Sequence, residues 1–259
     1  MKTADISVEY IQHTGNDLMV ANAARVSFDK ESAWLYDSEF PEMYIESLHN
    51  GSGYTIDDPG VTKTLSEKDA KLIRYLANHK HTSPFNHSYI TLRIKAPVFV
   101  ARQLVKHKFM PWNEVSRRYV DDEPEFYFPD VWRAKAENVK QGSSEESAGY
   151  MQKEQWDGTE STNCYCTTEE LVYRDIRSIL GMYQDMVANG VCAEQARMIL
   201  PQNMMTSWWW SGTLGAYCDM LRLRLDPHTQ KESRIVAEKV KEIIEPLFPV
   251  SVPALLAIN

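Results

Sequence analysis

The sequence is poor in cysteine, has no long apolar run and carries no excess of positive charge. Four cysteines among 259 residues, none at C-x-x-C spacing, argue against a disulfide scaffold and a zinc ribbon. No run of about 18 apolar residues occurs, so no transmembrane helix is expected. The net charge of −8 disfavours general binding to nucleic acid or to anionic membranes.

The first sixteen residues mix charged and apolar side chains and lack the apolar stretch of a signal peptide. We therefore expect a cytoplasmic protein (in the host cytoplasm if the gene is viral), with no nucleic-acid and no membrane partner. No metal site is expected either. The spacing of His79, His81 and His87 matches no common zinc pattern, and the acidic run 121–123 is typical of a solvated turn.

The length and the hydrophobic content of 43% suit a globular domain with a sizeable core. Alternating apolar residues predict strands near 6–10 and 88–94, and 126–129 reads as a short aromatic strand or turn. Helical periodicity and capping residues predict helices over 18–26, 66–78, 168–189, 193–199, 206–225 and 231–244. Residues 98–105 fit either a helix or a strand. The expected architecture is α+β: a single domain over 1–259, with a sheet packed against helices, long C-terminal helices and loop insertions at about 29–64 and 141–168.

The segment 102–119 concentrates positive charge in an acidic protein. Lys106, His107 and Lys108 are followed by Arg117 and Arg118, with polar Asn113, Glu114 and Ser116 between them. Cationic and hydroxyl side chains at such spacing favour phosphate binding. The stretch 79–87 lies just upstream and is rich in histidine. We interpret it as a polar turn bordering a planar ligand.

These segments resemble the flavin-dependent thymidylate synthase family. The family's signature is R-H-R-x-x-S-x-N-E-x-S-x-R-Y, and this chain matches it at His107, Asn113, Glu114, Ser116, Arg118 and Tyr119. Lys106, Lys108 and Pro111 depart from it; both lysines keep the charge but lose the bidentate fork of arginine. Further similar blocks lie at 15–18, 23–28, 81–87, 96–103, 196–201 and 223–232, so the resemblance covers most of the chain.

The resemblance implies a thymidylate-synthase-complementing-protein-like fold and a homotetramer with active sites built from more than one subunit. It implies reductive methylation of dUMP to dTMP, with methylenetetrahydrofolate as one-carbon donor and NADPH-reduced FAD as hydride source. Arg224 is the implied catalytic residue, a fixed positive charge that favours loss of the N3 proton of uracil. The residues implied for dUMP binding are Gln103, Lys106, Glu114, Ser116, Arg117, Arg118, Arg197 and Arg224.

The residues implied for FAD binding are His81, Ser83, Asn86, Lys106, His107, Lys108, Glu114, Thr213, Gly215 and Asp219. The last three depart from the family, which commonly has Asn, Arg and Asn there, and Gly215 has no side chain to donate a hydrogen bond.

Two alternatives stay open from the sequence. One is a related C5-methylase or hydroxymethylase that acts on UMP or dCMP, which the departures at Lys106, Lys108 and Pro111 suggest. The other is a non-catalytic nucleotide-binding homologue, which the departures at Thr213, Gly215 and Asp219 suggest. A cysteine-dependent mechanism is disfavoured, because none of the four cysteines has a neighbouring histidine or a cationic setting in the sequence.

Overall fold

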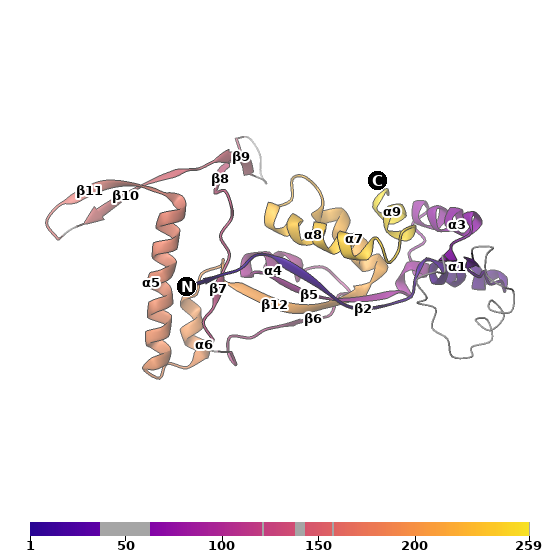
Figure 1. The fold of residues 1–259 in the computed structure, drawn as a ribbon, viewed down its shortest axis with the longest axis horizontal. Helices are drawn as coiled ribbons and strands as arrows, with labels where there is room; N and C mark the ends of the chain where they lie inside the picture. The colour runs from indigo at the N-terminus through magenta and orange to yellow at the C-terminus, as the bar shows by residue number, and fades with distance from the viewer. Residues whose placement is uncertain (37–62, 121, 138–142, 157, 259) are drawn as a thin grey trace. The chain divides into compact units, whose positions relative to one another are not determined.

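The computed structural model describes residues 1–36, 63–120, 122–137, 143–156 and 158–258 (Figure 1). It is a mixed helix and sheet fold, which confirms the predicted α+β class. The α-helices are α1 (Asp17–Arg25), α3 (Glu67–Asn78), α4 (Val98–Leu104), α5 (Thr168–Ala188), α6 (Ala193–Ala196), α7 (Leu214–Arg224), α8 (Lys231–Ile244) and α9 (Ser251–Leu256). The 3-10 helices are η1 (Val26–Phe28), η2 (Ser83–Asn86) and η3 (Arg197–Ile199).

The strands are β1 (Lys2–Thr3), β2 (Ser7–Thr14), β3 (Leu35–Tyr36), β4 (Lys63–Thr64), β5 (Tyr89–Pro97), β6 (Trp112–Glu114), β7 (Glu125–Phe126), β8 (Arg133–Lys135), β9 (Ser143–Ser147), β10 (Tyr150–Trp156), β11 (Ser161–Thr167) and β12 (Met205–Thr213). The largest sheet has four strands in the order β2-β5-β12-β6. Within the part of the chain described, no helix is long and apolar enough to cross a bilayer.

The predicted helix over 206–225 is wrong in its first eight residues, because 206–213 belong to strand β12. The alternation of a strand explains the tryptophan run: Trp208 and Trp210 are 1% and 0% exposed, whereas Trp209 is 50% exposed. Trp208 pairs with Glu114 of β6 in the antiparallel register and stacks on Trp112 at a ring-centroid distance of 4.2 Å. β12 therefore fixes the position of the signature segment.

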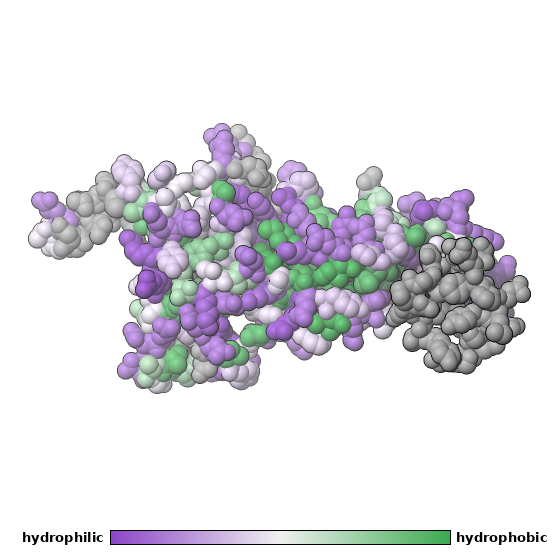
Figure 2. All heavy atoms as spheres, viewed as in Figure 1, coloured by the Kyte–Doolittle hydropathy of each residue, from purple (hydrophilic) through white to green (hydrophobic). Residues whose placement is uncertain are grey.

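Contacts divide the chain into two compact units. The first comprises 1–12, 91–212 and 219–242, and the second comprises 13–90, 213–218 and 243–259. In the first unit, α5 packs on α6 and β7 around Phe126, Ile176, Leu180 and Tyr183 (Figure 1). Thr167 and Glu170 form the capping box that starts α5, and Gly190 follows its end at a φ of 84°. In the space-filling view, hydrophilic residues with smaller apolar areas cover the visible face around α5 (Figure 2).

The segment 141–168, expected as a loop, is largely strand. β10 and β11 form an antiparallel hairpin that leads directly into α5, and β9 pairs with β8 (Figure 1). Its composition is rich in Ser, Thr and Glu, and cross-strand pairs of such residues stabilise a two-stranded ribbon. The loop insertion expected at about 29–64 lies mostly outside the described residues.

In the second unit, α3 starts at the predicted cap Ser66, and α1 starts one residue before the predicted range, after its N-cap Asn16. Asn16 accepts a hydrogen bond from the Met19 amide, and Ser66 accepts one from the Asp69 amide. The buried Asp17 carboxylate accepts from the amides of Val250 and Ser251, at 2.7 and 3.0 Å, and so joins α1 to α9. Helix α9 was not predicted, because Pro246 marks the end of α8 and a helix of six residues beyond it gives no clear periodicity. Segment 98–105, left open between helix and strand, is helix α4.

Candidate functional site

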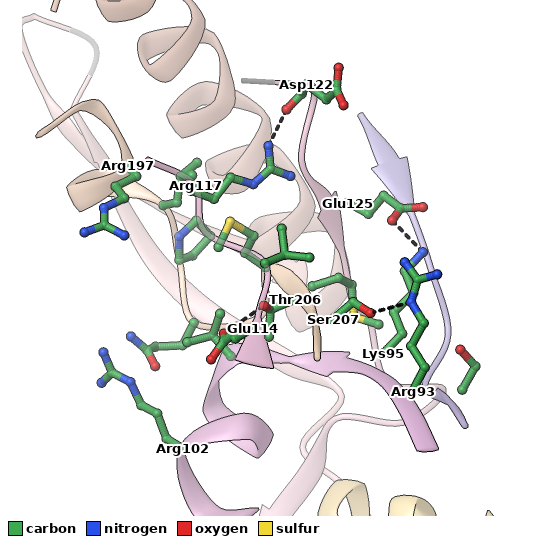
Figure 3. Close-up of a pocket in the computed structure, with 18 of the residues that line it drawn as sticks. Arg93, Lys95, Arg102, Glu114, Arg117, Asp122, Glu125, Arg197, Thr206 and Ser207 are labelled. Atoms are coloured by element: carbon green, nitrogen blue, oxygen red, sulfur yellow. Dashed lines mark hydrogen bonds and ion pairs between the residues drawn. The ribbon is translucent and has the colours of Figure 1, made fainter. Parts of the chain in front are cut away.

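A cavity of about 820 Å³ lies in the first unit, beside the signature segment. Of the residues predicted to bind dUMP, it is lined by Glu114, Arg117 and Arg197 (Figure 3). The lining also includes Arg93, Lys95 and Arg102. Arg102 and Arg197 extend to one side of the cavity, and Arg93 and Lys95 lie on the other (Figure 3).

Four guanidinium groups of this cavity keep their positive charge unneutralised within the described chain. Arg117 donates to the main-chain carbonyl of Asp122, Arg197 to that of Glu194 at 3.3 Å, and Arg93 to the Ser207 hydroxyl at 3.3 Å. No hydrogen bond or ion pair of Arg102 occurs among the residues described. Lys95 differs, because it pairs with Glu125 at 2.6 Å. Guanidinium groups with neutral partners remain available to an anionic ligand, above all a phosphate.

Glu114 is held in a defined orientation although its side chain is exposed. Its Oε1 accepts a hydrogen bond from the Thr206 hydroxyl at 2.8 Å, and its Oε2 accepts one from the Trp112 indole at 3.1 Å. Both donors come from the paired strands β12 and β6. A carboxylate fixed in this way can accept further hydrogen bonds from a ligand's N–H or hydroxyl groups.

A second cluster in the first unit surrounds Arg224. Its Nε donates to Nε2 of His107 at 3.0 Å, and its Nη2 donates to the main-chain carbonyl of Gln103 at 3.3 Å. The Gln103 side chain is in turn tied to α8, because its Oε1 accepts from the buried Ser233 hydroxyl at 2.9 Å and its Nε2 donates to Gln230. The structure therefore joins the predicted catalytic residue to two residues predicted to bind ligands.

His107 is neutral in this arrangement. The Nε of arginine is always a donor, so Nε2 of His107 must be the acceptor and the ring proton must lie on Nδ1. Burial, and next the charge of Arg224, lower the pKa of His107 to about 4, although Asp219 acts in the opposite direction. Burial also lowers the pKa of Arg224, but a guanidinium stays charged at neutral pH.

The rest of the signature is more exposed. Arg118 Nε donates to Ser116 Oγ at 3.1 Å, and its guanidinium lies over the Tyr119 ring at 4.9 Å. Lys106 and Lys108 are exposed and form no hydrogen bond or ion pair with any described residue. Lys106, Ser116 and Arg118 do not line the cavity. The structure therefore divides the predicted dUMP set between the cavity, the Arg224 cluster and these three residues on either side of β6.

The second unit holds the predicted flavin turn. His81, Ser83 and Asn86 are all exposed on and beside η2. The exposed Tyr75 ring stacks on His79 at 4.0 Å and lies 6.4 Å from the His81 ring. This row of rings offers a planar surface that a flat ligand could cover.

Thr213 and Gly215 belong to the same unit as this turn. Thr213 Oγ1 donates to Asn86 Oδ1 at 2.8 Å and accepts from the Ala216 amide at 3.2 Å, which caps the start of α7. A Cβ on Gly215 would lie 2.5 Å from Asn86 Oδ1. Asn86 therefore occupies the space beside Gly215. The other predicted flavin residues, Lys106, His107, Lys108, Glu114 and Asp219, belong to the first unit.

Replacing Gly215 by alanine is expected to displace Asn86 and break its hydrogen bond with Thr213, at a cost of about 1 kcal/mol. Gly181 in α5 is the matched control, because a Cβ there meets nothing within 4 Å. Gly181→Ala should raise the free energy of unfolding by about 0.5–1 kcal/mol through helix propensity alone. Urea denaturation measures both. An equal gain in Gly215→Ala would show that Asn86 does not restrict this position.

Arg93, Lys95 and the polar residues of β12 line the cavity but were not predicted from the sequence. Arg93 and Lys95 stand two apart on β5, so they share one face of the strand. That spacing was a usable signal. Thr206 and Ser207 carried no such signal, because the segment was read as a helix. Among the residues described, no cluster of three or more metal-ligating side chains occurs.

The chain is similar to known proteins of one family. Residues 9–250 match the family model described as thymidylate synthase complementing protein. A flavin-dependent thymidylate synthase of Thermus thermophilus is 32% identical over 249 residues, covering 94% of this chain and 73% of the relative. One from Thermosipho melanesiensis is 32% identical over 193 residues, covering 74% of this chain and 79% of the relative.

A solved structure is also similar over the whole chain. The UMP/dUMP methylase PolB from Streptomyces cacaoi, bound with 5-Br dUMP, superimposes with a TM-score of 0.70 at 25% identity, covering 100% of this chain and 98% of that chain. A second structure of the same methylase, bound with 5-Br UMP, gives a TM-score of 0.67. Family model, relatives and fold agree, and the chain belongs to the thymidylate synthase complementing protein family, that of the flavin-dependent thymidylate synthases.

Proposed function

We propose that this protein is a flavin-dependent thymidylate synthase that converts dUMP to dTMP. The methylene carbon of methylenetetrahydrofolate would replace the hydrogen on C5 of uracil, and two electrons from NADPH would reduce that carbon to a methyl group. The observation that carries the proposal is the Arg224 cluster: a guanidinium fixed by a neutral histidine and a main-chain carbonyl, in a chain of this family.

Arg224 can stabilise negative charge on a pyrimidine. Its Nε and Nη2 are occupied, whereas Nη1 forms no hydrogen bond within the described chain, so that edge is free for a ligand oxygen or nitrogen. A fixed positive charge there favours the deprotonated N3 form of uracil and so raises the nucleophilicity of C5. No cysteine thiolate is needed for this activation.

The cavity supports the choice of a phosphorylated substrate, and Arg197 provides a test. Within the described residues, the one hydrogen bond of the Arg197 guanidinium is to a main-chain carbonyl, so we assign Arg197 to the phosphate of dUMP. Arg197→Gln should raise the KM for dUMP about 10- to 100-fold, the loss expected for one hydrogen bond to a charged group, with a smaller change in kcat. Arg177→Gln, on the exposed face of α5, is the control and should leave both constants unchanged. An unchanged KM in Arg197→Gln would remove Arg197 from the site.

The side chains predicted to contact the flavin have the chemistry that FAD binding requires. The exposed ammonium groups of Lys106 and Lys108 suit a diphosphate, and the rings beside His81 with the polar groups of Ser83 and Asn86 suit a flat heteroaromatic ring. When bound, FAD would supply the hydride transfer that no side chain of the protein can perform. Purified protein that carries a flavin absorption spectrum would support this assignment.

The homotetramer is part of the same proposal. Several large apolar side chains are strongly exposed, among them Phe28 at 76%, Phe109 at 86% and Met198 at 78%. Exposed apolar residues of this size are typical of surfaces that other subunits cover. Light scattering on the purified protein would give the oligomeric state directly.

Tritium release from [5-³H]dUMP tests the reaction. The assay contains methylenetetrahydrofolate, FAD and NADPH, with each omitted in turn. We expect release that requires all three. Flavin binding without any release from dUMP, UMP or dCMP would contradict a methylase and favour a non-catalytic nucleotide-binding protein.

UMP is the second candidate substrate, because the similar structure of 25% identity is a UMP/dUMP methylase. The two nucleotides differ only at the 2′ position of the sugar. Parallel assays with tritiated UMP and dUMP compare their kcat/KM values. A ratio that favours UMP would replace dTMP by 5-methyl-UMP as the product.

A further inference from the structure

His107, which the family resemblance assigns to FAD binding, also contacts Arg224. Its Nε2 lies 3.0 Å from Nε of Arg224, although the two residues are 117 positions apart in the sequence. The contact therefore requires the folded chain, and both residues belong to the same compact unit.

The backbone holds the histidine in place. The His107 amide donates to the Leu104 carbonyl at 3.1 Å, which continues the last turn of α4. Two residues later, Phe109 has a φ of 61°, in the left-handed region that few non-glycine residues adopt. The Trp210 ring lies 6.2 Å from the His107 ring and limits its movement. The imidazole thus stands on a rigid turn.

From these contacts we infer that His107 is a positioning residue that holds the Arg224 guanidinium in its working orientation through a neutral Nε2 acceptor. The inference rests on the proposed function for its catalytic consequence, but not for the contact itself. The Gln103 carbonyl, anchored by Ser233 and Gln230, is the second support. With two N–H groups held by rigid acceptors, the guanidinium plane is fixed and Nη1 points to one place.

Protonation would abolish this arrangement. An imidazolium has no acceptor nitrogen, and its positive charge would repel Arg224. The charged groups around the ring are Arg224, which opposes protonation, and Asp219, which favours it; Asp219 is itself paired with Arg222. The other described groups that reach the cluster carry no charge: Gln103 from α4, Ser233 from α8 and Gln230 from the residue before α8. Among the described residues, Asp219 is thus the acidic group that acts on His107, and its pairing with Arg222 limits how far it offsets a second positive charge there.

The direct test is the Nε–H signal of Arg224 in nitrogen-15 NMR of arginine-labelled protein, assigned by its absence in Arg224→Lys. We expect slow exchange of this proton with water in the wild type at neutral pH. His107→Gln offers an amide oxygen in place of Nε2 and should keep much of the protection, whereas His107→Ala should lose it. As the pH falls through about 4, protection should disappear in the wild type but persist in His107→Gln.

Kinetics at saturating FAD and dUMP supply the second readout. His107→Ala should lower kcat about 100-fold, as expected for a displaced catalytic group, and His107→Gln should recover part of the loss. Unfolding curves of both variants exclude a folding defect, and His228→Gln, at an exposed histidine, is the control. Equal Nε–H exchange in wild type and His107→Ala would overturn the inference. Failure of the wild type to methylate any pyrimidine nucleotide would overturn the proposed function instead, and the exchange measurement would still decide the role of His107.

Discussion

Replacing Arg224 by alanine is expected to lower kcat/KM for dUMP by about 100- to 1,000-fold, mainly through kcat. Removing a fixed donor from a developing negative charge costs about this much in enzymes where it has been measured. The structure gives the reason: His107 and the Gln103 carbonyl hold this guanidinium through Nε and Nη2, and Nη1 has no partner among the residues described. Tritium release under saturating and limiting dUMP measures the effect.

Two control variants sharpen this result. Arg224→Lys keeps the positive charge but lacks the planar fork, so it should fall between wild type and Arg224→Ala. Arg177→Ala removes an exposed arginine of α5 and should leave the rate unchanged. If Arg224→Ala released tritium as fast as the wild type, Arg224 would have no part in the chemistry.

The largest expected effect on stability comes from the buried ion pair between Arg133 and Glu232. Arg133 Nη2 lies 2.9 and 3.1 Å from the two carboxylate oxygens, and the side chains are only 14% and 7% exposed. Arg133→Met would leave the carboxylate buried without its partner, which should lower the free energy of unfolding by about 3–5 kcal/mol. Urea unfolding measures the change.

The double variant separates the interaction energy of the ion pair from the separate contributions of Arg133 and Glu232. In Arg133→Met/Glu232→Met, both charges are gone, so most of the loss should be recovered. If the losses of the single variants simply add, so that the double variant is less stable than either, the two side chains contribute to stability independently. Because the pair ties β8 to the start of α8, the comparison also reports how firmly α8, and with it Ser233, is held.

Local signals predicted much of the fold. Ser66 and Thr167 cap α3 and α5 as the sequence indicated, because capping depends on neighbouring residues only. The Trp208–Trp210 stretch was wrongly predicted as helix. Thr, Ser and Trp also suit a buried strand, and only the pairing with β6 decides between helix and strand. The hairpin β10–β11 was missed for a related reason: its strands are polar, and their pairing leaves no apolar period in the sequence.

The site was predicted in part. The motif resemblance pointed to Glu114, Arg197 and Arg224 and also to Gln103 and His107, but not to the hydrogen bonds that Arg224 forms with the last two, nor to Thr206 as the partner of Glu114. Thr206 orients Glu114 from a strand 92 positions away, and such long-range pairs leave no trace in a single sequence. Gly215 is the opposite case. Its missing side chain was visible in the sequence, but the reason, a contact with Asn86, required the structure.

The most direct measurement follows the one-carbon unit itself. Purified protein is incubated with dUMP, NADPH, FAD and methylenetetrahydrofolate labelled with carbon-13 in its methylene group, and the nucleotide product is analysed by mass spectrometry and NMR. The account predicts dTMP with the label in its C5 methyl group, formed only when NADPH is present and not formed by Arg224→Ala. Unlabelled dTMP, or dUMP left unchanged in the presence of bound flavin, would contradict the account.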